Sequence, residues 1–241
     1  MKSNRFDAVR RFASVGSTND VAAALPPGSV VVAGQQTAGR GRRGHTWFSP
    51  PGAGLYVSVV LAPATARIDP PRATMLLTLA AGVAIAEGIA AAVGLAAELK
   101  WPNDVLAGGR KLAGILAEGH GDIVVLGYGI NVMETAFPPA LRDHATSLES
   151  ELRHAVDRDL VLDETLAALS RRYDDLVDGR FDAILDAWRG RAPRAVGARV
   201  NWTANGVVFE GVTEGIDDHG ALLVRVDDSV ERIISGEIQW L

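Results

Sequence analysis

The sequence contains no cysteine, which excludes disulfides, thiolate metal sites and cysteine nucleophiles. A chain without cysteine suits a reducing compartment, so we expect a cytoplasmic protein. The N-terminal stretch MKSNRFDAVRRFASV lacks the apolar core of a secretory signal. The P-loop pattern G-x-x-x-x-G-K-[ST] is also absent from the sequence, as are internal repeats and low-complexity tracts.

Acidic residues are missing from one long interval. The chain has 29 Asp and Glu against 24 Lys and Arg, yet neither acid occurs between Asp20 and Asp69. The same interval carries four arginines, Arg40, Arg42, Arg43 and Arg67. In a chain of net charge -5 this indicates a localised anion site. General nucleic-acid binding is not expected, because it usually needs a basic surface.

Long hydrophobic runs are scarce. The most apolar run, residues 75–95, is interrupted by Glu87 and is rich in Ala and Gly. This composition predicts a buried helix rather than a membrane span. Hydrophobic residues make up 48% of the chain, which is enough for a substantial core. We therefore expect a globular protein without a membrane segment.

Local patterns predict both strands and helices. Ser17-x-x-Asp20 before an Ala-rich run predicts a helix start. Strands are expected at residues 29–36, 54–61 and 98–102, and two more within 110–132, joined by a hairpin turn at 119–122. Helices are expected at residues 72–94 and within 162–191. Because several strands would pair as neighbours, we expect an α+β fold with the helices on one face.

The last 45 residues differ in character from the rest. From residue 197, short β-type segments alternate with turn signals at 205–206, 217–220 and 227–228. This pattern predicts a small separate β-barrel, entered near Pro193. We therefore divide the chain into a domain of residues 1–193 and a C-terminal domain of residues 194–241.

The stretch GRGRRG, residues 39–44, matches the dinucleotide fingerprint G-x-G-x-x-G. That fingerprint must open a helix and needs an acid about 20 residues later. Here HTWFSPPG follows, its prolines forbid a helix, and the first acid downstream is Asp69. We reject the Rossmann interpretation. Glycines and arginines together predict a loop that grips phosphate or carboxylate, and Trp47 either stacks on a base or belongs to the core.

Two further patches are rich in polar residues and glycine. In KWPNDVLAGGRKLAGILAE, residues 100–118, Asn103 and Asp104 belong to a turn signature. Lys111 begins an apolar stretch, so its side chain either enters a pocket or is a solvated edge residue. Asn131, in GYGINV, is either a strand-end cap or a metal or phosphate contact. Glycines within these predicted strands leave room for a ligand: Gly114, Gly127 and Gly129.

Taken in order, these motifs resemble those of the biotin protein ligases: STN (17–19), QTAGRGRRG (36–44), Trp47, KWPND (100–104), RKLAGIL (110–116) and GYGIN (127–131). The resemblance covers residues 15–132, and the tail, with GIDDHGALLVRV and SGEIQWL, is similar to the C-terminal barrel of that family. Six motifs in one order are far more specific than any one of them. The resemblance implies a mixed, mainly antiparallel sheet with helices, as in class II aminoacyl-tRNA synthetases, followed by a small SH3-like barrel.

The resemblance implies a ligase that uses ATP and Mg²⁺ to activate biotin. Biotin's carboxylate attacks the α-phosphate, giving biotinyl-5'-AMP and pyrophosphate. A lysine of the biotin carboxyl carrier domain of a biotin-dependent carboxylase then attacks the adenylate, and AMP leaves. No acyl-enzyme is needed, which fits the absence of cysteine. We expect the glycine-rich loop to be mobile and to close over the adenylate, shielding it from water.

The resemblance also implies site residues. Those with catalytic roles are Lys111, Arg40, Arg42 and Asp104. Those that bind biotin are Ser17, Thr18, Asn19, Gln36, Gly39, Arg40, Arg42, Lys111, Gly114 and Gly129. Those that bind ATP or the adenylate are Arg42, Arg43, Trp47, Asn103, Lys111 and Asn131, and no metal ligand is identified.

Among these implied roles, Lys111 would bridge the carboxylate and the α-phosphate. Ser17, Thr18 and Gln36 would bind the ureido ring of biotin, and the glycines would line its slot. Trp47 would stack on adenine, and Asp104 would orient or deprotonate the acceptor lysine.

Some features depart from the family or leave alternatives open. Only 16 residues precede Ser17, too few for a winged helix-turn-helix, so we expect the catalytic-only class and no DNA binding. His45-Thr46 stand where relatives often have basic residues, which would weaken the hold on pyrophosphate or adenylate. The alternatives are a lipoate or octanoate ligase of the same superfamily, a non-catalytic biotin or nucleotide sensor, and an RNA binder. A homodimer also stays open.

Overall fold

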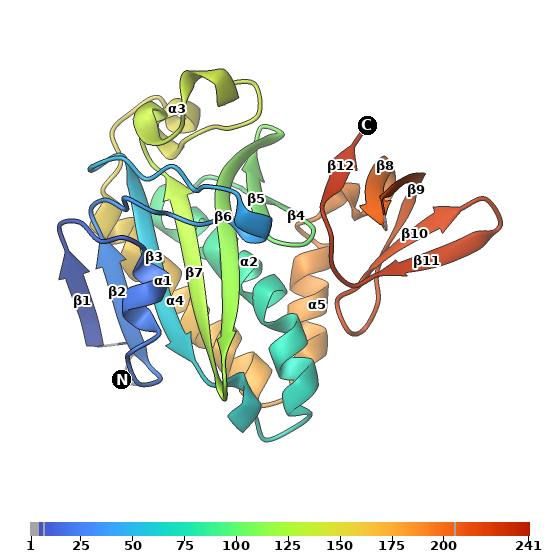
Figure 1. The fold of residues 1–241 in the computed structure, drawn as a ribbon, viewed down its shortest axis with the longest axis horizontal. Helices are drawn as coiled ribbons and strands as arrows, with labels where there is room; N and C mark the ends of the chain where they lie inside the picture. Colours follow the sequence, from blue (N-terminus) through green and yellow to red (C-terminus); the bar gives the residue numbers. More distant parts are fainter. Residues whose placement is uncertain (1–4, 7, 205) are drawn as a thin grey trace.

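The computed structural model describes residues 5–6, 8–204 and 206–241, which form two sheets and a set of helices (Figure 1). The larger sheet has the order β1-β2-β3-β7-β6-β5-β4. Its strands are β1 (Ala8–Phe12), β2 (Ser29–Ala33), β3 (Gly54–Leu61), β4 (Glu98–Lys100), β5 (Asp104–Ala107), β6 (Arg110–His120) and β7 (Ile123–Asn131). β1 pairs with β2 in parallel and the other neighbours pair antiparallel, so the predicted mixed, mainly antiparallel sheet is confirmed.

The helices are α1 (Thr18–Ala22), α2 (Pro70–Val93), α3 (Leu148–Leu152), α4 (Arg158–Val177) and α5 (Phe181–Arg189). Alternation along β2 separates the two faces of the sheet: Val30 and Val32 join the large core with α2 and α4. Val31 instead packs with Ala22 of α1 on the opposite face. The expectation that all helices cover one face is therefore wrong, because the short α1 covers the other. We call the α1 side the front face, as it is in Figure 1.

α2 meets the length and hydropathy expected of a membrane span, but 67% of its most apolar stretch is buried inside the protein. It begins after Asp69, whose side chain accepts a hydrogen bond from the backbone N–H of Arg72, and it ends at Gly94, with φ 70°. A Cβ on Gly88 would lie 2.5 Å from Cα of Thr165 in α4, so glycine lets the two helices touch. The prediction of a buried core helix is confirmed.

The C-terminal sheet has the order β11-β10-β9-β8-β12, with antiparallel neighbours. Its strands are β8 (Val196–Ala204), β9 (Val207–Ile216), β10 (Leu222–Val226), β11 (Ser229–Ile233) and β12 (Ile238–Trp240). This confirms a small C-terminal β domain. Within the described residues no ladder joins β11 to β12. The division after residue 193 stays a prediction, and it falls between α5 and β8.

Hydrogen bonds connect β4, Trp101 and α2 to the turn between β9 and β10 and to the segment after α5. Trp101 Nε1 donates to the carbonyl of Gly220 at 2.9 Å, and the backbone N–H of Leu99 donates to the carbonyl of Arg191 at 2.7 Å. Arg72 Nε donates to the carbonyl of Asp218 at 2.9 Å. These bonds hold the C-terminal sheet beside β4.

The hairpin from β6 to β7 is confirmed, with Gly121 at φ 62° in its turn. β1 was missed because every residue in it is exposed, so its pattern carries no buried period. β5 was missed because the turn signature at Asn103-Asp104 hid the strand that starts at Asp104. The predicted strands at 29–36 and 98–102 end earlier, at Ala33 and Lys100.

Candidate active site

One row of residues crosses the front face of the large sheet. In the register of the strands, Lys100 of β4 lies opposite Asp104 of β5, Asp104 opposite Gly114 of β6, and Gly114 opposite Gly129 of β7. Residues directly opposite each other project from the same face of a sheet. The row therefore places a lysine and a carboxylate beside two glycines, whose missing side chains leave a floor of bare backbone.

Lys111 reaches the same row because the β5–β6 pairing is irregular. The register shifts between Val105 and Leu106, where Leu106 pairs with Lys111. Such a bulge changes the direction in which a side chain points. Lys111 Cε lies 3.2 Å from the place that a Cβ on Gly114 would take, and Nζ lies 2.7 Å from Oδ1 of Asp104. Lys111 and Asp104 thus form an ion pair above the glycine floor.

The GRGRRG stretch forms a tight hairpin and opens no α-helix, which confirms that it is not a Rossmann turn. The backbone N–H of Trp47 donates to Gly39, and that of Gly41 donates to His45. Between them lies a single 3₁₀ turn, Arg42–Gly44, in which Arg43 has φ 54°. A Cβ on Gly39 would lie 2.7 Å from Oγ of Ser49, so glycine is needed for the close approach.

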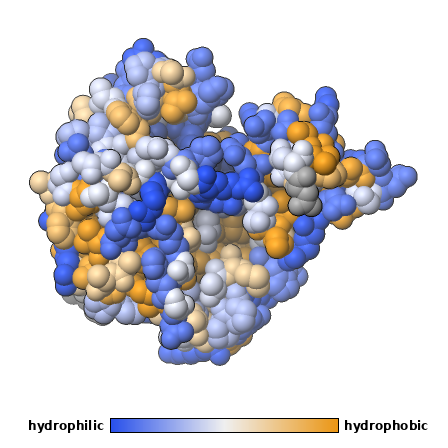
Figure 2. All heavy atoms as spheres, in the orientation of Figure 1, coloured by the Kyte–Doolittle hydropathy of each residue, from blue (hydrophilic) through white to orange (hydrophobic). Residues whose placement is uncertain are grey.

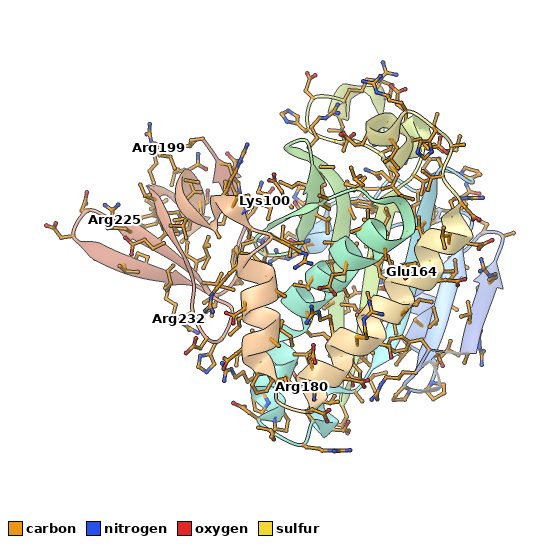
Figure 3. The ribbon with its side chains drawn as sticks, turned by 180° about the vertical axis from the view of Figure 1, so that it is seen from behind. Lys100, Glu164, Arg180, Arg199, Arg225 and Arg232 are labelled. Carbon is orange, nitrogen blue, oxygen red and sulfur yellow. The ribbon has the colours of Figure 1, made fainter. Side chains whose placement is uncertain are left out.

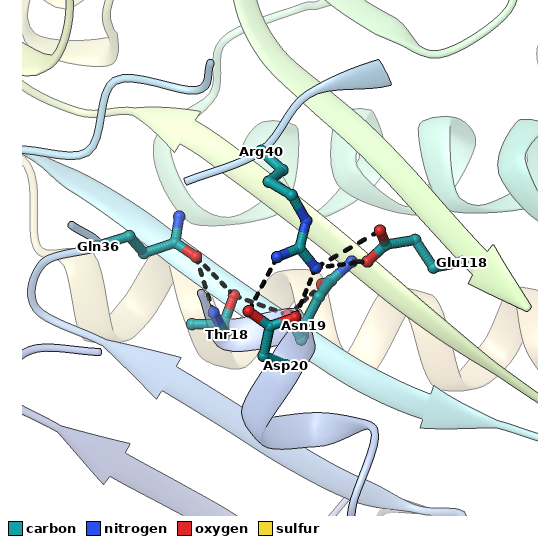
Figure 4. A network of polar contacts seen from close by, with 7 residues as sticks. Thr18, Asn19, Asp20, Gln36, Arg40 and Glu118 are labelled. Atoms are coloured by element: carbon teal, nitrogen blue, oxygen red, sulfur yellow. Dashed lines mark hydrogen bonds and ion pairs between the residues drawn. The ribbon is translucent and has the colours of Figure 1, made fainter. Parts of the chain in front are cut away.

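Arg40 is held by carboxylates of the protein itself (Figure 4). Its guanidinium donates two hydrogen bonds to Asp20, at 2.8 and 2.7 Å, and a third to Glu118 at 3.2 Å. The bond from Arg40 keeps the pKa of Asp20 below its usual value of 3.8. Asn19 Nδ2 also donates to Glu118, at 2.6 Å. We call the Arg40–Asp20–Glu118 contacts the loop latch, because they fasten the hairpin to α1 and β6.

The other arginines of the acid-free interval have different surroundings. Arg42 is half-buried and donates to Oδ1 of Asn103 at 2.9 Å, while Asn103 donates to the carbonyl of Ile115. Burial, with Arg43 nearby, lowers the pKa of Arg42. Arg43 is exposed at the rim. Arg67 lies 3.8 Å from Asp178 and does not line the cavity described below, so only three of the four arginines gather at the site.

A polar recess lies at the start of α1. Oε1 of Gln36 accepts hydrogen bonds from the backbone N–H and the hydroxyl of Thr18, at 2.8 and 3.0 Å. The Ser58 hydroxyl lies 2.7 Å from Thr18 Oγ1 and 2.6 Å from Asn19 Oδ1, and it donates its one proton to either oxygen. Ser17 stands at the N-cap position, but its side chain makes no capping hydrogen bond, which corrects the capping expectation. Its hydroxyl is buried beside the recess.

Trp47 lies against the glycine floor. Cβ atoms on Gly114 and Gly129 would lie 2.9 Å from Cζ3 and 2.5 Å from Cε2 of the indole, closer than real Cβ atoms tolerate. Lys111 Nζ lies 5.5 Å from the ring centroid, which permits a cation–π contact. The indole Nε1 is buried and has no hydrogen-bond partner among the described residues. The two glycines thus accommodate Trp47 in this conformation.

These residues surround one cavity of about 240 Å³. Figure 2 shows hydrophilic residues gathered on this face around the 3₁₀ turn of the hairpin. Expected site residues that line the cavity are Ser17, Thr18, Asn19, Gln36, Arg40, Arg42, Arg43, Trp47, Asn103, Asp104, Lys111, Gly114 and Gly129. Two others do not line it: Gly39 shapes the hairpin, and Asn131 donates to the carbonyl of Thr146 at 3.0 Å.

Several residues at the cavity were not anticipated. Lys100, the first residue of KWPND, is one of them, and a basic residue directly before the turn is a sequence signal for it. Gly236, Glu237 and Ile238 reach the cavity from the C-terminal sheet, and Glu237 Oε2 lies 3.8 Å from Nε2 of His45. No local sequence pattern predicts that residues so far apart in the chain will line one cavity. Glu118 was missed for the same reason.

Two parts of the chain match two family models. Residues 12–132 match the biotin/lipoate A/B protein ligase family, and residues 196–240 match the biotin protein ligase C-terminal domain. The biotin–[acetyl-CoA-carboxylase] ligase of Paracoccus denitrificans is 38% identical over 88% of this chain and 92% of its own length. The bifunctional ligase/repressor BirA of Bacillus subtilis is 37% identical over 89% of this chain. This chain spans 66% of the length of that relative.

Solved structures are similar over nearly the whole chain. The biotin protein ligase from Aquifex aeolicus in complex with biotin and ATP superposes with a TM-score of 0.86 at 27% identity, covering 98% of this chain and 99% of that one. The fold and the match over residues 12–132 place the chain in the biotin/lipoate A/B protein ligase family. Because its C-terminal part matches as well, the chain belongs to the biotin protein ligase family.

Proposed function

We propose that the protein joins biotin to ATP as biotinyl-5'-AMP and transfers the biotinyl group to a lysine of a biotin carboxyl carrier domain. The observation that carries the proposal is the Lys111–Asp104 pair, which lines the same cavity as the recess at Thr18 and Gln36 and the arginines of the hairpin. Two anions, the carboxylate and the triphosphate, must meet in this reaction. Preorganised cations lower the cost of that encounter.

The recess suits the head of biotin. A urea group has one acceptor and two donors, and the recess offers hydroxyls of Ser17 and Thr18 and the side-chain amide of Gln36. The valerate chain then passes over Gly114 and Gly129, and the carboxylate arrives beside Lys111. Lys111 holds the carboxylate next to the α-phosphate, and Arg42 binds the phosphates. The carboxylate oxygen attacks phosphorus, the bond to the β-phosphate oxygen breaks, and pyrophosphate carries away the electron pair.

The loop must rearrange for both substrates to bind. A cavity of about 240 Å³ is below the roughly 300–1,000 Å³ typical of small-molecule sites. Trp47 now lies on the glycine floor that biotin would cross. When biotin binds, the indole of Trp47 therefore moves off Gly114 and Gly129. The ring face that this movement exposes is the one that stacks on adenine. Gly39 shapes the hairpin that makes this movement, and Arg40 anchors its base through the loop latch. This refines the expected direct contact of Arg40 with ligand.

In the second step, the amine of a carrier lysine attacks the acyl carbon of the adenylate, and the bond to the AMP oxygen breaks. Asp104 orients that amine or accepts its proton in this proposal, which is supported by its position in register with Gly114 and Gly129, over which the biotinyl chain would pass. Asn103 positions Arg42, and Arg43 lies at the rim. Asn131 donates to the carbonyl of Thr146, whose own backbone N–H donates to the carbonyl of Lys111, so Asn131 ties the end of β7 to the segment beside Lys111.

The residues also fit a magnesium ion that accompanies ATP. Mg²⁺ in nucleotide sites keeps several waters and uses one or two carboxylates together with phosphate oxygens. The described residues hold no cluster of three or more His, Asp or Glu that would form an all-protein metal site. Asp104 and Glu237 are the carboxylates of the cavity wall. When bound with ATP, the ion would neutralise phosphate charge.

The wider assignment follows from this reaction. The partners are biotin, ATP and the carrier domain of a biotin-dependent carboxylase, and the location is the cytoplasm, where such carriers and ATP are found together. The catalytic part corresponds to residues 1–193, and residues 194–241 contribute Gly236, Glu237 and Ile238 to the cavity wall. A lipoate ligase and a biotin sensor remain outcomes of the test.

The test is pyrophosphate release with ATP and Mg²⁺ in the presence of biotin or of lipoate. Biotin-dependent release is expected, and Lys111→Ala should lower it at least about 100-fold, because one preorganised donor is worth roughly 10²–10³ in rate. Arg225→Ala, an exposed change on the C-terminal sheet, is the control and should leave the rate unchanged. Release with lipoate alone would assign the lipoate ligase. Tight biotin binding without release would leave a sensor.

A further inference from the structure

Lys100 is a cavity residue to which neither the family motifs nor the steps above give a role. It ends β4 and lies one strand beyond Asp104 in the row across the front face. Figure 3 places Lys100 beside the C-terminal strands. Gly114 lies two strands away, about 10 Å of sheet. Lys100 is therefore on the far side of the Lys111–Asp104 pair from the recess at Thr18 and Gln36.

Unlike Arg40 and Lys111, Lys100 makes no close ion pair, although the negative charges of Asp104 and Glu237 act on it. Arg40 is bound to Asp20 and Glu118, Arg42 to Asn103, and Lys111 to Asp104. Within residues 5–6, 8–204 and 206–241, the side chain of Lys100 has neither a hydrogen bond nor an ion pair. A cation held away from water without a partner is costly, and an anionic ligand would remove that cost.

The position of Lys100 is defined by aromatic residues. Its Nζ lies 5.9 Å from the ring centroid of Trp240, and the guanidinium of Arg194 lies 5.9 Å from the same ring. The next residue, Trp101, is buried and fixed by its hydrogen bond to Gly220. Burial lowers the pKa of Lys100. The negative charge of Asp104 opposes this shift, and the positive charge of Lys111 adds to it. The ammonium is thus presented to the cavity by the C-terminal sheet.

We infer that Lys100 binds the β- and γ-phosphates of ATP and stabilises pyrophosphate as it leaves. The inference rests on the proposed function. When the carboxylate attacks the α-phosphate beside Lys111, the bond from phosphorus to the bridging oxygen breaks, and negative charge grows on the departing group. A fixed ammonium at that place stabilises the charge as it develops. Trp240 and Arg194 act as positioning residues for Lys100.

The two half-reactions separate this role from others, because pyrophosphate takes part only in the first. For Lys100→Met we expect adenylate formation to slow by about 30- to 100-fold, in the range of a charge-assisted contact. In the reverse reaction, the pyrophosphate concentration for half-maximal ATP formation from biotinyl-5'-AMP should rise by a similar factor. Transfer from preformed biotinyl-5'-AMP to a carrier domain should stay within about twofold of wild type.

Two variants serve as references. Lys100→Arg keeps the charge and should recover most of the pyrophosphate affinity. Arg67→Met removes an exposed cation away from the cavity and should change neither half-reaction. If Lys100→Met lowers the melting temperature, Lys100→Arg and Trp240→Leu supply the comparison, and Trp240→Leu should weaken pyrophosphate by a smaller factor.

Unchanged use of pyrophosphate by Lys100→Met would overturn the inference. A loss confined to transfer would also overturn it and would indicate that Lys100 binds an acidic carrier surface instead. If the wild-type protein formed no adenylate, the proposed function would fail, and this result is distinct from either outcome for Lys100.

Discussion

Replacing Gly129 by alanine tests the glycine floor directly. The new methyl would lie 2.5 Å from Cε2 and 2.8 Å from Cζ2 of Trp47. The backbone of β7 cannot give way, because Gly129 is paired with Tyr56 on one side and Gly114 on the other. The indole must therefore leave the floor, and biotin would meet the same methyl group.

The size of the effect follows from the cost of overpacking. Forcing an extra methyl into a packed site costs about 1–3 kcal/mol. At about 1.4 kcal/mol for each tenfold change, biotin affinity should fall roughly 5- to 150-fold. Titration calorimetry with biotin measures this, and tryptophan fluorescence reports the displaced indole. The matched control is Gly119→Ala on β6, where nothing lies within 4 Å of the added Cβ. If Gly129→Ala bound biotin within twofold of the wild-type affinity, the proposal that biotin passes over Gly129 would be refuted.

Three further predictions concern polar contacts. Arg172→Met removes the nearest ion-pair partner of Glu87, whose side chain is 17% exposed, and leaves it with the guanidinium of Arg191 at 3.4 Å. Chemical denaturation should then show a loss of about 1–3 kcal/mol in the free energy of unfolding. Asn103→Ala removes the oxygen that accepts a hydrogen bond from the Arg42 guanidinium at 2.9 Å. The KM of ATP should therefore rise about tenfold in steady-state assays. Because Arg40 lowers the pKa of Asp20, the latch is intact above pH 3.8 and is lost as pH falls further, so loop fluorescence should change only in that acid range.

Each of these three has an outcome that contradicts it. Arg225→Met, at an exposed pair, should cost at most about 1 kcal/mol, and an equal loss in both arginine variants would remove the argument from burial. An Asn103→Ala protein with normal ATP kinetics would show that Arg42 needs no anchor. For the latch, Trp47→Phe identifies the fluorescence of the loop among the five tryptophans, and a transition near neutral pH would contradict the assignment to Asp20.

The sequence was most informative where a pattern is local. The apolar run that became α2 and the hairpin between β6 and β7 follow from composition and turn residues alone. β1 was not predictable in this way, since all its residues are exposed and it lies at the edge of the sheet, beside β2. β5 is short and follows a turn signature at once.

The site shows the same division. The motifs contain most of the residues that line the cavity, but half of the lining residues had no predicted role, and the motifs did not reveal the contacts between them. Arg40 sits in a stretch without acids, and its partners Asp20 and Glu118 come from outside that stretch. Lys111 faces the cavity because of a bulge that no periodicity indicates. Glu237 arrives from the other sheet, about 130 residues further along the chain than Asp104.

The most direct test of the account is the mass of a biotin carboxyl carrier domain after incubation with the protein, ATP, Mg²⁺ and biotin. The account predicts a gain of one biotinyl group on a single lysine, dependent on ATP and lost in Lys111→Ala. An unmodified carrier in the presence of biotin, or modification only when lipoate replaces biotin, would contradict it.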